Sequence, residues 1–473
     1  MGHGQRLSGL DASFLQLESD AVHMHVAACA IFDGPPPTYA ELLHTISSRL
    51  DLIPRYRQRL AGVPFWQGRP VWVDDPQFRL MFHVRHTGLP RPGADVQLQR
   101  LAGRIFSQTL DRSRPLWELW LVEGLEDNRF ALLSKTHHAL VDGVDGLDIA
   151  SVLFDSERFV DPAPAVRQSW TPRPVPSSMQ LLADAVIERA TTPAELARGI
   201  RAVGRCPRRV ADSAVDALAG LGALSWAGIE TAPPSPFNVP IGPHRRFTWI
   251  NASLDDFRLV KERFAVTVND VVLAAVAGAL GAYMRVHGQP TAELVLKALV
   301  PVALRQPDAP DQLSDRLGAM RAPLPVGVQE PAARLRIVNN ATAAAKESGQ
   351  ALGAGALSEL TGFATPTILS QAARLQARQR VFNLVVTNVP GPQQPLYVCG
   401  RRLRAIYPLA PLAQNTALGI AVISYDGRLD FGLNADFDAL TDLEFLADEL
   451  RGAIAALFQA AGRRDPVIAP TPS

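Results

Sequence analysis

The chain is long, close to neutral and ordinary in composition, which excludes several kinds of protein. Its 473 residues are 47% hydrophobic, enough to bury two cores, because single domains usually hold about 100 to 200 residues. The formal net charge is only +1, so nothing indicates the strongly basic face that nucleic acid binding needs. The cysteines Cys29, Cys206 and Cys399 are widely separated and favour neither a disulfide framework nor a zinc site.

No segment of the sequence indicates export or a membrane span. The first residues, MGHGQR, lack the basic and then apolar pattern of a signal peptide. The longest apolar run, Val271 to Met284, is shorter than the ~20 residues needed to cross a bilayer. We therefore expect a cytoplasmic protein in which this run forms a buried helix.

The N-terminal part, residues 1–160, alternates short apolar strands with helical stretches. Strands are expected at Val26–Phe32 and Leu119–Gly124, and a helix is expected at Tyr39–Leu50. This alternation predicts a first domain of the α+β kind.

Residues 161–236 are predicted to connect this domain to a second one. Proline and small residues dominate 162–176 and favour an extended linker. A helical stretch follows at about Ser178–Trp226, with arginines beside apolar residues. It is either a solvated helix pair between domains or a basic amphipathic surface that adsorbs on anionic lipid, and the sequence leaves both open.

The second half, residues 237–462, repeats an α/β architecture without an obvious sequence repeat, and a tail follows at 463–473. A nearly all-apolar helix is expected at Val271–Met284. Three strands are expected after it, at Leu294–Leu304, which leads into Arg305, at Phe382–Val389 and at Leu418–Ser424. The fold class is therefore α/β (α+β), in two domains.

The motif HHALVDG, residues 137–143, closes an apolar run that starts at Phe130. In a strand, side chains alternate between two faces, so His138 shares a face with Phe130 and Thr136, and His137 points the other way. Adjacent histidines on a strand cannot easily hold one metal ion, and no zinc-ligand spacing lies nearby. The motif is either a strand end with an ordinary turn or a general base with a carboxylate and a glycine at fixed offsets. The spacing favours the base.

Five segments together resemble one known family. They follow one another in the expected order across most of residues 5 to 450: LSGLDASF at 7–14, RPLWE at 114–118, HHALVDG at 137–143, VNDVVL at 268–273 and TNVPGP at 387–392. HHxxxDG resembles the motif of the CoA-dependent acyltransferase superfamily, and the five together resemble the bacterial wax ester synthase/diacylglycerol acyltransferase family. The DFGWG signature of plant alcohol acyltransferases is absent. The resemblance implies two chloramphenicol-acetyltransferase-like domains, mixed sheets flanked by helices, with a tunnel between them.

The resemblance also implies roles within HHALVDG. His138 lies near the middle of the tunnel as the general base that takes the proton of an alcohol, and His137 and Gly143 support its geometry. Asp142 forms a salt bridge with an arginine of the second domain, for which Arg305 is the best match; alternatively, Arg305 is a surface charge at a strand end. The acyl group is transferred directly in a ternary complex, and no GxSxG nucleophile elbow is present.

Further candidate residues come from the other segments. Asn269 is a candidate donor to the oxyanion, but Asn269 and Asp270 open an apolar helix and would serve equally as caps. Thr387 and Asn388 precede a Pro-Gly-Pro turn and are either donors or turn formers. The remaining candidates pack against the acyl chain or support the tunnel wall: Pro115, Leu116 and Trp117.

The family implies an acyl-CoA-dependent O-acyltransferase that esterifies diacylglycerol to triacylglycerol, with wax ester synthesis from long-chain alcohols as the closest alternative. The implied partners are acyl-CoA as co-substrate and one of these acceptors, without cofactor or metal, at the inner face of the plasma membrane or at lipid droplets. Relatives commonly carry Asn and Ser where this chain has Asp315 and Gly318. This departure leaves open a different class of function, a catalytically weak or inactive member that binds lipid or scaffolds lipid droplets.

Overall fold

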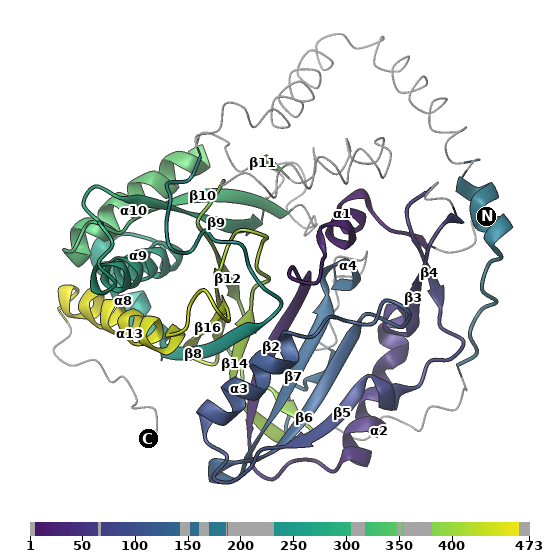
Figure 1. The fold of residues 1–473 in the computed structure, drawn as a ribbon. Coiled ribbons are helices and arrows are strands. Elements are labelled where there is room, and N and C mark those ends of the chain that lie inside the picture. The colour runs from purple at the N-terminus through teal and green to yellow at the C-terminus, as the bar shows by residue number, and fades with distance from the viewer. Residues whose placement is uncertain are drawn as a thin grey trace, which may run out of the picture.

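The computed structural model of the chain has two lobes, each built on a mixed sheet with helices packed against it (Figure 1). It describes residues 5–64, 68–141, 152–159, 170–185, 187, 231–303, 317–347, 352–353 and 381–462. The predicted architecture of two α/β units with mixed sheets flanked by helices is confirmed.

A six-stranded sheet organises the first lobe, in the order β13-β14-β2-β7-β6-β5. Only the β5–β6 pair is parallel among these described strands. The strand bounds in chain order are β2 (His25–Asp33), β5 (Val84–Gly88), β6 (Trp117–Leu125), β7 (Arg129–His137), β13 (Tyr397–Val398) and β14 (Arg401–Leu409).

Helices cover both faces of this sheet, and β7 supplies apolar side chains to each face. Phe130 and Leu132 lie in a buried cluster with residues of α1 (Gly9–Leu17) and α2 (Tyr39–Arg49). Ala131 and Leu133 lie in a second cluster with residues of α3 (Asp95–Phe106). Such burial on both faces explains the continuous apolar run Phe130–Leu133 near the start of β7.

Smaller elements complete the first lobe. A three-stranded sheet has the order β1 (Gln5–Arg6), β4 (Val71–Asp74) and β3 (Gln58–Ala61). Helical residues 178–185 pack on it through Leu181 and Ala185. The remaining short elements are α4 (His138–Val141) and the 3-10 helices η1 (Leu50–Leu52), η2 (Pro54–Arg57), η4 (Leu80–Phe82) and η5 (Glu126–Asn128).

The second lobe is built on a seven-stranded sheet in the order β11-β10-β9-β12-β15-β16-β8. Figure 1 shows its helices α8, α9, α10 and α13 on one side of this sheet. The bounds in chain order are β8 (Arg245–Ser253), α8 (Leu254–Phe264), α9 (Val268–Val286), β9 (Val295–Ala303), β10 (Leu317–Pro325), α10 (Pro331–Glu347), β11 (Leu352–Gly353), β12 (Leu384–Pro390), β15 (Leu418–Tyr425), β16 (Arg428–Asp436) and α13 (Leu443–Ala460).

The helix α9 is the core helix of the second lobe. Among the described residues it is the one helix with the length and composition of a membrane span, but 78% of that window is buried inside the protein. The predicted buried helix at Val271–Met284 is therefore confirmed.

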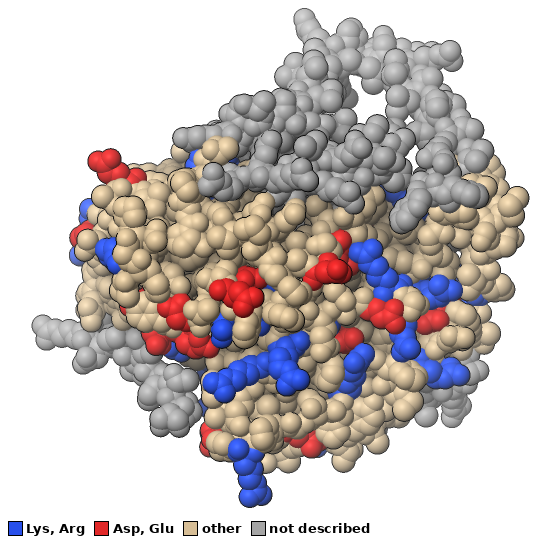
Figure 2. Space-filling model, in the orientation of Figure 1, with Lys and Arg blue, Asp and Glu red and all other residues tan. Residues whose placement is uncertain are grey.

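Charged side chains of both signs share the face drawn in Figure 2. Lys and Arg side chains gather over the area where Figure 1 draws α3 and β8, and Asp and Glu side chains lie among them. α3 contributes the exposed Arg100 and Arg104. This face therefore presents no extended field of one sign, as the near-neutral net charge leads one to expect.

The strand β14 links the two lobes, because it belongs to the C-terminal half of the chain but pairs with β2 of the first sheet. It passes over β16, whose residues 430, 432 and 434 share one face of the strand. Asp430 accepts a hydrogen bond from the Ile406 N–H at 3.0 Å, and the Asn434 amide donates to the Ala410 carbonyl at 2.9 Å. Between them, Gly432 leaves room for the Pro408 carbonyl.

Gly432 is required by this close approach. A Cβ atom at Gly432 would lie 1.8 Å from the Pro408 carbonyl oxygen, a distance at which backbone must move. Asp430 is fully buried, and burial raises the pKa of its carboxyl to about 6 despite nearby Arg428.

The predicted division of the chain into domains at residues 1–160 and 237–462 stays a prediction. The structure adds that residues 397–409, from the C-terminal half of the chain, complete the first sheet.

Most predicted elements are found within a few residues of their expected bounds. The strands at Val26–Phe32, Leu119–Gly124, Leu294–Leu304 and Leu418–Ser424 correspond to β2, β6, β9 and β15. The expected extension of the strand through His138 is wrong by one residue, because β7 ends at His137 and His138 opens α4. The greater part of the expected helical stretch at Ser178–Trp226 lies outside the described residues.

We predict that Gly432→Ala lowers the free energy of unfolding by about 3 kcal/mol, because the added methyl group forces β14 away from β16. Urea denaturation measures this change. The control is Gly452→Ala on α13, where a Cβ meets no atom within 4 Å and removal of a helical glycine should add about 1 kcal/mol. Equal changes in the free energy of unfolding for the two substitutions would contradict the close contact between β14 and β16 at Gly432.

Candidate active site

The backbone at the end of β7 is held from two sides. The His137 N–H donates to the Leu116 carbonyl at 2.9 Å, and the His138 N–H donates to the Met24 carbonyl at 2.9 Å. Leu116 precedes β6 and Met24 precedes β2, the two neighbours of β7. Consecutive residues are therefore fixed to opposite neighbours immediately before the chain turns into α4.

The side chain of His137 is buried and acts as an internal acceptor. Its Nδ1 accepts a hydrogen bond from the Ala139 N–H at 3.1 Å, so the ring proton of the neutral form resides on Nε2. Burial lowers the pKa of His137 to about 4, although Glu18 acts in the opposite direction. His137 is therefore a neutral ring at neutral pH, and its Nδ1 lone pair is used to cap the first turn of α4.

Glu18 lies on the other side of the His137 ring. Its Oε1 is 3.8 Å from His137 Nε2, and both atoms are buried without a hydrogen-bond partner among the described residues. Its Oε2 accepts hydrogen bonds from Arg112 at 2.6 and 3.0 Å. Arg112 also donates to the Leu15 carbonyl at 2.8 Å. The carboxylate therefore fixes the C-terminal end of α1 beside the histidine pair.

His138 is half-buried and its ring packs against Phe14 of α1, with 4.3 Å between the ring centroids. Figure 1 draws α1 beside α4, and the two helices are in contact. The LSGLDASF segment builds α1, because Ser8 caps it by accepting from the Asp11 N–H at 3.0 Å and donating to the Asp11 carboxylate at 2.7 Å. This segment thereby places an aromatic ring on the candidate base.

Pro115, Leu116 and Trp117 support the histidines from the β6 side. All three residues are buried, and Trp117 lies opposite Thr136 in the β6–β7 ladder. The Trp117 indole N–H donates to the Tyr56 carbonyl at 2.8 Å. The ring of His83 stacks on Trp117 at 4.8 Å. The hydrogen bonds of Leu116 and Trp117 thus hold the strand ends, and a contact of this segment with the acyl chain stays a prediction.

Asn269 and Asp270 lie in the first turn of α9, in the second lobe. Asp270 forms a capping box with Thr267 and accepts hydrogen bonds from Asn339 at 2.9 Å and Thr342 at 2.6 Å. Burial alone would raise the pKa of Asp270, but these hydrogen bonds outweigh it and lower the pKa below its ordinary range. Asp270 therefore joins α9 to α10, and Asn269 beside it is half-buried.

Thr387 and Asn388 lie where the second sheet divides. β12 pairs with β15 as far as Pro390, but among the described residues it pairs with β9 only at Leu384 and Val385. The half-buried Thr387 and Asn388 therefore lie on a section of β12 that pairs with β15 and not with β9. Their strand neighbours are β9 and β15, so the sheet topology does not bring them to β7.

Three of the predicted site residues, Asp142, Gly143 and Arg305, lie outside the described residues, so the salt bridge between Asp142 and Arg305 stays a prediction. Gly318 lies in β10, and Asp315 is also outside the described part. Within the described part, no group of three His, Cys, Asp or Glu side chains is arranged to hold a metal ion.

Sequence reasoning did not identify Glu18 and Met24 as site residues. Glu18 contributes a side chain and Met24 contributes only a carbonyl, which carries no sequence signal. Both residues reach the histidines through the pairing of β2 with β7 and the turn of the chain after α1. The available signal was the position of Glu18 four residues after Phe14, the last residue of LSGLDASF.

Sequence comparison explains why these segments occur together. The sequence model of the wax ester synthase/diacylglycerol acyltransferase catalytic domain matches residues 7–272, and the model of the C-terminal domain of the same family matches residues 314–458. The chain belongs to this family. It is therefore an acyltransferase, and the predicted resemblance is confirmed.

Individual relatives agree with this assignment over nearly the whole chain. Proteins of Mycobacterium bovis and Mycobacterium tuberculosis that are named diacylglycerol O-acyltransferases are 35% identical over 468 residues, covering 97% of this chain and 96% of theirs. The structure of a wax ester synthase/diacylglycerol acyltransferase from Marinobacter aquaeolei superposes with a TM-score of 0.69 at 28% identity, covering 97% of this chain and 100% of that one. A starter condensation domain of rhizomide synthetase shares the fold, with a TM-score of 0.55 at 14% identity over 98% and 97% of the two chains.

The buried state of His137 predicts a pH dependence of stability. The folded protein keeps this ring neutral down to about pH 4, whereas the ring in the unfolded chain binds a proton below about pH 6.5. Acid therefore favours the unfolded chain, and His137 alone should lower the free energy of unfolding by about 2 kcal/mol between pH 7 and pH 5. His137→Asn keeps an acceptor for the Ala139 N–H but removes the titration.

The measurement is urea unfolding at pH 7 and pH 5 for the wild type, His137→Asn and the control His44→Asn, at an exposed position of α2. We expect His137→Asn to lose less stability on acidification than the wild type. The buried His23, His25 and His83, whose pKa values are also lowered by burial, leave a remaining slope in every variant. If His137→Asn lost as much stability between pH 7 and pH 5 as the wild type, this would contradict the burial of His137 as a neutral ring.

Proposed function

We propose that the protein is an acyl-CoA-dependent O-acyltransferase that esterifies diacylglycerol to triacylglycerol, with His138 as the general base. The names of the relatives at 35% identity support the acceptor. The observation that carries the proposal is the preformed position of His138, because its backbone N–H is held by Met24 and its ring by Phe14.

The chemistry follows from the weak acidity of an alcohol. As the hydroxyl oxygen of diacylglycerol attacks the thioester carbonyl of acyl-CoA, its proton passes to the neutral imidazole of His138. The tetrahedral intermediate then collapses, the C–S bond breaks, and the CoA sulfur receives the proton from His138. No covalent acyl-enzyme forms, and acyl-CoA is a co-substrate, so the reaction needs neither a cofactor nor a metal.

The flanking residues have supporting roles in this proposal. Asp142 pairs with Arg305 of the C-terminal half of the chain, and Gly143 allows the turn at the end of the motif, as in the family. Asn269 donates to the oxyanion from the first turn of α9, where the positive end of the helix dipole favours negative charge. Thr387 and Asn388, beside the division of β9 and β12, contact the substrate. The enzyme works as a peripheral protein at the inner face of the plasma membrane or at lipid droplets.

Wax ester synthesis is the second candidate function. The similarity to the Marinobacter aquaeolei wax ester synthase/diacylglycerol acyltransferase over the whole chain favours it. In this reaction a long-chain alcohol replaces diacylglycerol and the roles of the residues are unchanged. The alternative of a lipid-binding protein without turnover would depend on the altered Asp315 and Gly318.

CoA release from a long-chain acyl-CoA, measured with diacylglycerol and with long-chain alcohols, tests these functions. We predict acceptor-dependent release that falls at least about a hundredfold in His138→Ala, because general base catalysis contributes about 10² to 10⁴ in rate. The melting temperature of His138→Ala should be close to that of the wild type. Full activity in His138→Ala would rule out this base, and tight lipid binding without CoA release would favour the non-catalytic alternative.

A further inference from the structure

The segment from Glu18 to His25, here called the 18–25 segment, belongs to the first lobe but is anchored in the second. It connects α1 to β2. A closed turn shapes its tip, because the Val22 N–H donates to the Ser19 hydroxyl at 3.2 Å and the Ser19 N–H donates to the Val22 carbonyl at 2.9 Å. The turn presents the side chain of Val22 and the carbonyl of Ala21 to the second lobe.

Val22 is the apolar anchor of this turn. Its side chain is 4% exposed and lies in the hydrophobic cluster of the second lobe, with Phe237, Ile241 and Ile250. Ala21 and Met24 pack against the same cluster. The tip of the 18–25 segment is thus part of the core of the other lobe, so movement of one lobe relative to the other must disturb it.

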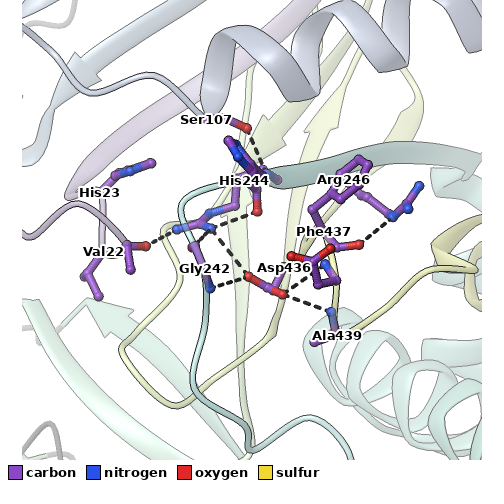
Figure 3. A network of polar contacts seen from close by, with 12 residues as sticks. Val22, His23, Ser107, Gly242, His244, Arg246, Asp436, Phe437 and Ala439 are labelled. Atoms are coloured by element: carbon purple, nitrogen blue, oxygen red, sulfur yellow. Dashed lines mark hydrogen bonds and ion pairs between the residues drawn. The ribbon is translucent and has the colours of Figure 1, made fainter.

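Arg245, the first residue of β8, is the polar anchor. Its guanidinium donates to the Gly242 carbonyl at 2.7 Å, to the His244 carbonyl at 3.0 Å and to the Ala21 carbonyl of the first lobe. Its backbone N–H donates to the Ser107 hydroxyl at 2.8 Å, at the C-terminal end of α3. Figure 3 shows Gly242, His244 and Asp436 of the second lobe meeting Ser107 and Val22 of the first.

The charge of Arg245 is balanced inside the protein. Burial lowers the pKa of Arg245 to about 10, with Asp436 acting in the opposite direction, so the guanidinium stays charged at neutral pH. The nearest atoms of the two side chains are 3.9 Å apart. Asp436 uses its oxygens on the N–H groups of Gly242, Asp438 and Ala439. The three hydrogen bonds that the Arg245 guanidinium donates in the described part of the chain therefore go to backbone carbonyls. One of these carbonyls, that of Ala21, belongs to the first lobe.

The other end of the 18–25 segment holds the histidine pair. The Met24 carbonyl accepts the His138 N–H, and the Glu18 carboxylate lies beside His137. His25 adds a bond from its Nε2 to the Phe106 carbonyl at 3.0 Å. Only two residues, Val22 and His23, lie between the carbonyl held by Arg245 and the carbonyl that holds His138.

We propose that Arg245 is a positioning residue for acyl transfer, which sets the place of His138 from the opposite lobe through the 18–25 segment. Arg245 fixes the Ala21 carbonyl, the closed turn carries this constraint to Met24, and the Met24 carbonyl fixes the backbone of His138. The base is then aligned only while the two lobes are correctly docked. The kinetic part of this proposal rests on the proposed role of His138 as the base.

The test compares Arg245→Met with Arg246→Met. Methionine preserves much of the side-chain volume but donates no hydrogen bond, so it releases the Ala21 carbonyl. Arg246 is the matched control, since it donates to the Phe437 carbonyl at 2.9 Å and lies over the Phe437 ring, both in the second lobe. Each variant is assayed for kcat and KM and for hydrogen–deuterium exchange at the amides of His138 and Leu133.

In Arg245→Met we expect kcat to fall about tenfold to a hundredfold, because small displacements of a catalytic group have effects of this size. KM for acyl-CoA should change little, and the His138 amide should exchange faster while the Leu133 amide in the middle of β7 is unchanged. Arg246→Met should match the wild type in every measurement. Wild-type exchange at His138 in folded Arg245→Met would overturn the proposal, and so would faster exchange with unchanged kcat.

Two further variants keep the proposal testable if Arg245→Met does not fold. Arg245→Lys retains the buried charge but cannot reach all three carbonyls, and Val22→Ala weakens the apolar anchor; both should reproduce the effect in milder form. Unchanged kcat and exchange in both would overturn the proposal. If the wild type releases no CoA with any acceptor, the proposed function fails, but exchange at His138 still decides whether Arg245 controls this amide.

Discussion

Two backbone hydrogen bonds at successive residues are the constraint on which the candidate site depends. The N–H groups of His137 and His138 donate in opposite directions, to carbonyls at the starts of β6 and β2. These bonds fix the chain at the point where it leaves the sheet and enters α4. The backbone of His138 is therefore fixed and its ring packs on Phe14, so the proposed base need not lose backbone freedom when a substrate arrives.

The family segments acquire separate physical roles around this constraint. LSGLDASF caps α1 and brings Phe14 to the ring of His138, while Leu116 accepts the His137 N–H and Trp117 ties β6 to Tyr56. VNDVVL begins the core helix of the other lobe through the capping box of Asp270. The lobes are joined by the crossing of β14 over Gly432 and by Arg245, so a site on one lobe is supported by residues of both.

Sequence patterns predicted the elements well where burial determines periodicity. β2, the first half of β7 and α9 carry runs of apolar side chains because they are buried on both sides or all round. The prediction of His138 as the candidate base rested on one local spacing. Contacts between residues far apart in sequence were not predictable. The carbonyl of Met24, the carboxylate of Glu18 and the pairing of β14 with β2 all depend on how the chain folds back on itself, and a carbonyl group is the same in every residue.

The central claim is that the position of His138, the proposed base, is preformed, and amide hydrogen exchange of the unliganded wild-type protein tests it most directly. The account predicts that the amides of His137 and His138 exchange as slowly as that of Leu133 in the middle of β7, because both are bonded to strand neighbours. Addition of acyl-CoA should then increase their protection little. Fast exchange at His137 and His138 without ligand, beside a protected Leu133, would show that the end of β7 is ordered only by substrate and would contradict the account.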